Sequence, residues 1–106
     1  MAAMIAYITA QNREEALRIG KALVEARLAA CINVLGELES VYWWKGQMEE
    51  SRECGLLAKT DSSRAEDLIS KVKELHGYEV PCVVLWPLAG GNPDYLGWIE
   101  RECGNA

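Results

Sequence analysis

Residues 40–47 read Ser-Val-Tyr-Trp-Trp-Lys-Gly-Gln, and this stretch decides the fold. Its β-branched and aromatic side chains favour an extended strand, and Gly46-Gln47 supplies a turn after it. A second long strand then runs from Met48 to Thr60. The sequence therefore predicts a central hairpin whose strands, at about a dozen residues each, exceed the usual five or six.

The first strand of this hairpin begins well before the aromatic residues, at Cys31-Ile-Asn-Val-Leu35. Gly36-Glu-Leu-Glu39 then interrupts it, and glycine tolerates the unusual dihedral angles of a bulge or bend. We therefore expect an irregularity at Gly36, after which Ser40 resumes the strand.

Two amphipathic helices flank the hairpin in the sequence. Asn12 can cap the first, because Glu15 stands at the capping-box spacing after it. Ser63 opens the second, and Gly77 ends it. In both segments apolar residues recur at steps of three and four, which is typical of a helix that covers one face of a sheet.

The outer elements complete the order. Residues 5–9 form a first short strand, and the apolar run 80–86 forms a last strand with Pro81 at its start. Asn92-Pro93 begins a short C-terminal helix. The order βαββαβ predicts an α+β, ferredoxin-like sandwich, with both helices on one face of an antiparallel sheet. At 106 residues, the range 1–106 is one domain.

The charge balance limits the partners. Sixteen acidic residues against eleven basic ones give a net charge of −5. Such a surface repels nucleic acid and anionic lipid and mildly attracts cations, so we expect no nucleic acid and no membrane partner. The N-terminal stretch has no basic region of the signal-peptide kind, which favours a cytoplasmic protein.

The four cysteines are widely separated and form no Cys-x-x-Cys pair. In a cytoplasmic chain they should be reduced. The simplest interpretation of Cys31 and Cys82 is that they fill small buried spaces in strands.

This architecture leaves one face of the sheet bare and the long hairpin edges unpaired. Exposed edges invite pairing, and a patch of large aromatic side chains is costly in water. A closed cyclic assembly of copies would cover both. We expect its interface to contain Val41, Tyr42, Trp43, Trp44 and Trp98. The alternative is that the C-terminal helix alone folds back over the bare face.

Five fragments resemble the CutA family of divalent-ion tolerance proteins, in order and over essentially the whole chain. They are Ala29-Ala-Cys-Ile-Asn33, Ser40-Val-Tyr-Trp-Trp-Lys-Gly46, Lys59-Thr60, His76-Gly-Tyr-Glu-Val-Pro81 and Tyr95-Leu-Gly-Trp98. The resemblance implies a ferredoxin-like subunit of a homotrimer, similar in architecture to the PII signalling proteins. It also implies a role linked to tolerance of copper and other divalent cations, without an established enzymatic reaction.

Two departures from the family pattern concern the turn after the second helix and the copper ligands. The family's His-Pro-Tyr is His76-Gly77-Tyr78 here, and a glycine raises the entropy of the unfolded chain at that turn. The copper ligands of some members correspond to Ile8, Leu75 and His76, so two of the three are missing. That copper site is therefore not carried over.

Metal binding would depend on few residues. The metal candidates are His76, Cys31 and Glu79, joined at subunit interfaces by hairpin carboxylates such as Glu53. Such sites would hold copper or another divalent cation weakly. The alternative for His76 is a cap on the last carbonyls of its helix.

A second candidate function is a PII-like sensor with a small anionic ligand in the clefts between subunits. Lys59, Tyr78 and Trp44 would line that cleft, since a lysine at a strand end can neutralise a phosphate or carboxylate. The alternative for Lys59 is an ion pair with a hairpin glutamate. Cys31 with His76 is the only nucleophile-and-base pair, and no third group orients it, so we expect no enzyme.

Overall fold

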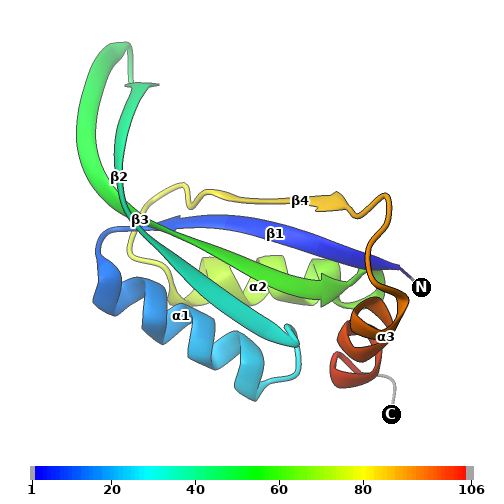
Figure 1. The fold of residues 1–106 in the computed structure, drawn as a ribbon. Helices are drawn as coiled ribbons and strands as arrows, with labels where there is room; N and C mark the ends of the chain where they lie inside the picture. Colours follow the sequence, from blue (N-terminus) through cyan, green and yellow to red (C-terminus); the bar gives the residue numbers. More distant parts are fainter. Residues whose placement is uncertain (1, 105–106) are drawn as a thin grey trace.

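The computed structural model describes residues 2–104. Its sheet has the strand order β2-β3-β1-β4, and every neighbouring pair is antiparallel (Figure 1). This arrangement confirms the predicted α+β, ferredoxin-like βαββαβ sandwich. The elements in chain order are β1 (Ala3–Ala10), α1 (Arg13–Glu25), β2 (Cys31–Trp44), β3 (Gln47–Asp61), the 3-10 turn η1 (Ser62–Arg64), α2 (Ala65–Leu75), β4 (Val83–Pro87) and α3 (Pro93–Glu102).

Helices α1 and α2 cover one face of the sheet and form the core with it (Figure 1). Alternate residues of β1, such as Ala6 and Ile8, point into this layer and are fully buried. Ile19 of α1 and Val72 of α2 pack against them. Each large aliphatic side chain buried here contributes about 1.5–3 kcal/mol, so this layer fixes which sheet face turns inward.

The predicted caps of α1 and α3 are present. Asn12 Oδ1 accepts a hydrogen bond from the Glu15 amide at 2.8 Å, and Asn92 Oδ1 accepts one from the Asp94 amide at 3.0 Å. Pro93 takes the first helical position of α3. Both bonds satisfy amide groups that the helix itself leaves without partners.

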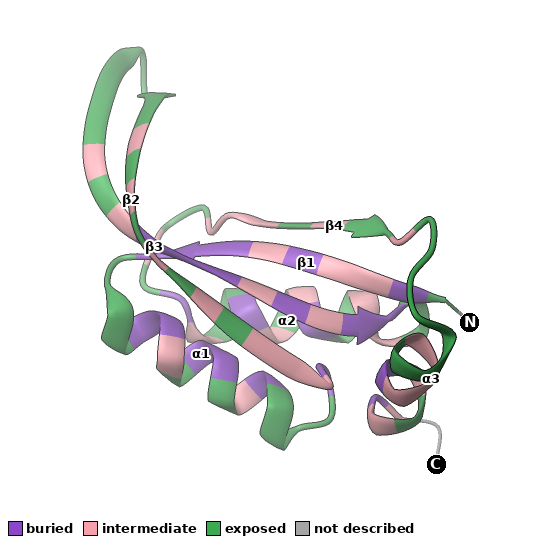
Figure 2. Ribbon diagram, in the orientation of Figure 1, coloured by how far each residue is buried: buried purple, intermediate pink, exposed green. Residues whose placement is uncertain are grey.

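The hairpin is the largest departure from a minimal sandwich. Strands β2 and β3 have 14 and 15 residues, and their outer part curves away from the sheet on the side opposite the helices (Figure 1). That part is mostly exposed, whereas β1 and inner β3 are mostly buried (Figure 2). The predicted irregularity is a β-bulge between Val34 and Gly36, where Gly36 has φ of +111°. The strand nevertheless continues without a break.

The hairpin turn lies one residue earlier than predicted. Trp44 pairs with Gln47, so Lys45-Gly46 forms the turn instead of Gly46-Gln47. Lys45 and Gly46 have φ of +51° and +82°, as in a two-residue turn of type I′, whose twist matches that of the flanking strands.

The starts of α2 and β4 also differ from the predictions. Asp61, not Ser63, provides the cap before α2, and it accepts the Ser63 amide at 3.0 Å. Ser63 lies inside η1, because the chain makes one tighter turn before the α-helix begins. The last strand begins at Val83, after Pro81, which lacks the amide that a paired strand requires.

Helix α3 lies at one end of the sheet (Figure 1). There Ile99 and Cys103 form a second, small core with Ala3. The helix therefore does not cover the bare face alone, because Val84 and Trp86 of β4 stay 54% and 43% exposed. The alternative of a folded-back helix is wrong for these described residues.

Candidate functional site

A groove of about 790 Å³ lies between the outer hairpin and residues 77–82, and we call it the hairpin groove. Three aromatic side chains line it, Tyr42 and Trp44 from β2 and Tyr78 from the segment after α2. Its charged lining residues are the carboxylates Glu39, Glu53 and Glu79, and no lysine or arginine is among the described residues that line it. The groove is therefore aromatic and negatively charged.

Glu53 connects the two walls of the hairpin groove. Its Oε1 accepts a hydrogen bond from Ser40 Oγ at 2.6 Å. Burial, and after it the hydrogen bond and negative charge of Glu53, raise the pKa of the Tyr78 phenol. The phenol therefore stays protonated, and its interaction with the Glu53 carboxylate links the hairpin to the opposite wall of the groove.

Lys45 spans the outer end of the same groove. Its Nζ lies 3.4 Å from a carboxylate oxygen of Glu79 and 5.4 Å from the centre of the Trp44 ring. Both partners of the ion pair are about two-thirds exposed. The contact is therefore a weak, solvated link between the hairpin turn and residues 77–82.

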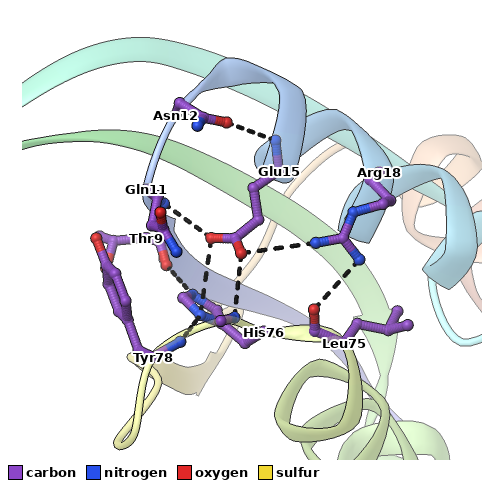
Figure 3. A network of polar contacts seen from close by, with 9 residues as sticks. Thr9, Gln11, Asn12, Glu15, Arg18, Leu75, His76 and Tyr78 are labelled. Carbon is purple, nitrogen blue, oxygen red and sulfur yellow. Dashed lines mark hydrogen bonds and ion pairs between the residues drawn. The ribbon is translucent and has the colours of Figure 1, made fainter.

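His76 lies beside Tyr78 and positions it (Figure 3). The Tyr78 amide donates to His76 Nδ1 at 3.1 Å, so Nδ1 carries no proton and Nε2 donates to the Thr9 carbonyl at 2.6 Å. The two rings also pack with their centroids 4.5 Å apart. The His76 side chain is fully buried. The alternative interpretation expected this ring to cap the end of its own helix, and it does not.

Glu15 holds this segment to α1 (Figure 3). Its carboxylate accepts the Gln11 amide at 2.9 Å and the Gly77 amide at 3.1 Å. Arg18 lies 3.6 Å from the same carboxylate and donates to the Leu75 carbonyl at 3.2 Å. Arg18 thereby satisfies a carbonyl at the end of α2, which the alternative interpretation assigned to His76.

The three metal candidates lie in different surroundings. His76 uses both ring nitrogens on protein partners, Glu79 pairs with Lys45, and Cys31 Sγ lies 3.5 Å from the Tyr95 hydroxyl. Within residues 2–104, no three His, Cys, Asp or Glu side chains come together as a metal site. Cys31 and His76 likewise contact different groups.

Of the predicted cleft residues, Trp44 and Tyr78 line the hairpin groove, and Lys59 does not. Lys59 Nζ donates to Asn33 Oδ1 at 2.5 Å and lies 5.8 Å from the centre of the Tyr95 ring. This contact replaces the alternative ion pair with a hairpin glutamate.

The predicted interface residues divide between two faces of the hairpin. Trp43, paired with Met48, is 75% exposed, whereas Tyr42 and Trp44 line the groove. Trp98 is half-buried against the small core of α3.

All four cysteines are free, and the two that were expected to fill buried spaces are not the buried pair. Cys54 and Cys103 are buried, whereas Cys31 and Cys82 are only half-buried. Cys54 and Cys103 occupy core positions of β3 and of the α3 end, and their spacing to other apolar residues is the signal that would have identified them.

Sequence reasoning missed two residues that shape the groove. In the sequence, Glu39 stands out only as part of the strand irregularity, and Glu15 only as a helix-capping residue. A long-range contact such as Glu15 to Gly77 leaves no local pattern in the sequence.

Comparison with known proteins gives the family. The pattern of the CutA1 divalent ion tolerance protein family matches residues 4–102. The chain belongs to this family. The divalent-cation tolerance protein CutA of Thermus thermophilus is 44% identical over 100 residues, which cover 94% of this chain and 97% of that protein. The resemblance found in the sequence is therefore confirmed.

Solved CutA structures share the fold. The T. thermophilus divalent cation tolerance protein superposes with a TM-score of 0.93 at 43% identity, covering 96% of this chain and 99% of that one. The periplasmic divalent cation tolerance protein CutA of Archaeoglobus fulgidus gives 0.92 at 36% identity, with 96% and 99% covered. Membership of the CutA family supports a role in tolerance of divalent metal ions. In residues 2–104, no helix has both the length and the apolar character needed to span a membrane.

Proposed function

We propose that this CutA-family chain acts in divalent-cation tolerance as a homotrimer that binds copper or another divalent cation weakly, without catalysis. The observation that carries the proposal is the hairpin groove, whose charged lining is three carboxylates. A negatively charged concave surface concentrates cations near it. Carboxylate oxygens also ligate divalent ions when enough of them converge.

Assembly would supply the convergence that one chain lacks. A tight site needs about four ligands, and the described residues of one subunit do not gather three. Glu79 is 69% exposed, so a neighbouring copy can add donors to it. Glu49 and Glu50 of the exposed hairpin are suitable donors. Cys31, half-buried near α3, is a second ligand candidate, whereas His76 would first have to release Thr9 or Tyr78.

The trimer itself is proposed from the exposed hairpin. Trp43, Val41 and Met48 are 75%, 63% and 61% exposed, and side chains of this size are costly to leave in water as a group. Strand β2 is also an edge of the sheet, with backbone groups available to another chain.

A cytoplasmic location belongs to the same proposal. All four cysteines are free, which suits a reducing compartment. A. fulgidus CutA is described as periplasmic and a CutA protein of Oryza sativa as chloroplastic, so relatives differ in location.

The PII-like alternative has no supporting observation. An anionic ligand needs a cation in its cleft, but Lys59 lies beside Asn33 and Tyr95, outside the hairpin groove. We therefore do not retain it.

Metal removal and titration test the proposal. Chelator-treated, reduced protein is titrated with Cu²⁺ and Zn²⁺ by calorimetry, and we expect weak, saturable binding. Glu79→Gln removes one carboxylate donor and should weaken metal binding by about tenfold, which corresponds to a loss of about 1.4 kcal/mol. The control is Glu66→Gln, an exposed residue of α2, which should change nothing. Absence of saturable binding to the wild type would reject metal binding as the function.

A further inference from the structure

The aromatic residues of the hairpin groove have no place in metal coordination. Tyr42, Trp44 and Tyr78 line the groove, and neither an aromatic ring nor a protonated phenol is a usual ligand of a divalent ion. The face of an aromatic ring does attract an organic cation, with tryptophan the strongest. Rings and carboxylates together, without a basic lining residue, match a ligand that has both positive charge and apolar surface.

The protein's own Lys45 makes the contacts of such a group at the outer end of the groove. The Lys45 ammonium lies between the Trp44 ring, at 5.4 Å, and the Glu79 carboxylate, at 3.4 Å. An ammonium held between an indole face and a carboxylate has the contacts that a bound organic cation would need. Lys45 is 67% exposed, and an exposed ion pair contributes little, so it can be displaced at small cost.

The inner wall is fixed before any ligand arrives. Ser40 donates to Glu53, and His76 holds the Tyr78 amide and packs against its ring. Glu53 is thereby already satisfied, whereas Glu79 has only its weak contact with Lys45. A wall that is already ordered costs a ligand less entropy on binding.

We propose that the hairpin groove binds a small organic cation, an ammonium or guanidinium on an apolar body, which replaces the Lys45 ammonium between Trp44 and Glu79. This function is separate from metal tolerance, because it depends on the ring faces and does not need a metal ion. Lys45 acts as an internal competitor that leaves the groove when the ligand enters.

Choline and its uncharged isostere 3,3-dimethyl-1-butanol test the charge requirement. Each is titrated by calorimetry into the full chain in the presence of EDTA, and we expect choline to bind about tenfold more tightly. Equal affinity for the two compounds, or no choline binding without metal, would overturn the proposal. A divalent-ion titration of the same protein is read separately, so failure of metal binding leaves the choline result intact.

Three variants test whether the cation binds between Trp44 and Glu79. Lys45→Gln should tighten choline binding several-fold, and Glu79→Gln and Trp44→Leu should each weaken it by about tenfold. The control Lys73→Gln changes an exposed lysine of α2 outside the groove and should have no effect. An unchanged affinity in both Lys45→Gln and Glu79→Gln would contradict the assignment even if Trp44→Leu failed to fold. Choline affinity that falls as protein concentration rises would show that a second copy fills the groove instead.

Discussion

His76 orders the segment that follows α2, because both of its ring nitrogens have protein partners. Nε2 donates to the carbonyl of Thr9 in β1, and Nδ1 accepts the amide of Tyr78. A buried polar group that loses such a partner costs far more than an exposed one. A single buried side chain therefore connects the sheet to one wall of the hairpin groove.

Replacing this histidine tests that connection. His76→Ala removes both hydrogen bonds and leaves a cavity, so the free energy of unfolding should fall by about 3 kcal/mol. Urea denaturation measures it. Lys73→Ala, on the exposed side of α2, is the control and should stay within about 0.5 kcal/mol of the wild type. A similarly small effect of His76→Ala would show that the network adds nothing to stability.

The Tyr78 phenol predicts a loss of stability at alkaline pH. Burial and Glu53 raise its pKa in the folded state, whereas an unfolded tyrosine loses its proton near pH 10. Above about pH 10 the folded chain thus binds more protons than the unfolded chain, and stability falls as pH rises. Urea denaturation from about pH 8 to about pH 11 should show a shallower decline for Tyr78→Phe. Equal slopes for both proteins would contradict this assignment.

At the scale of elements, the hairpin depends on two glycines that adopt a backbone conformation rare for other residues. Gly46 completes the turn and Gly36 the bulge, with φ of +82° and +111°. The bulge lies where β2 passes beyond the region in which β3 also pairs with β1. It therefore lies where the hairpin leaves the sheet.

Gly36→Ala tests the bulge. No atom lies within 4 Å of the position that the new methyl group would take, so the cost comes from the backbone alone. The free energy of unfolding should fall by about 1–3 kcal/mol. Gly90→Ala is a matched control, with equally open space and no positive φ. If both substitutions have the same small effect, the bulge carries no strain for alanine.

Local sequence signals predicted these elements well, but they did not predict contacts between residues that are distant in the sequence. The caps at Asn12 and Asn92 and the irregularity at Gly36 each follow from a few neighbouring residues. The turn was predicted one residue too late because Lys45 adopts a positive φ, and a lysine gives no sequence signal of that conformation. The groove could be predicted only in part, through Trp44 and Tyr78. The contacts of Glu15 and Lys59 join residues that are distant in sequence.

At the scale of the whole molecule, the chain is extended by its hairpin to 44 × 25 × 22 Å. The outer hairpin packs against little of its own subunit (Figure 2), while Trp43 and Met48 form an exposed apolar pair. An isolated hairpin is only marginally stable in water, and an exposed apolar patch on it is typical of a contact surface. We expect other copies of the chain to cover it.

Sedimentation equilibrium of the wild-type protein tests this central claim most directly. The account predicts a mass of about three times the 11.8 kDa of one chain. Trp43→Ser combined with Met48→Ser should lower that mass while the far-ultraviolet circular dichroism stays unchanged. The result that would contradict the account is a wild-type mass near that of a single chain.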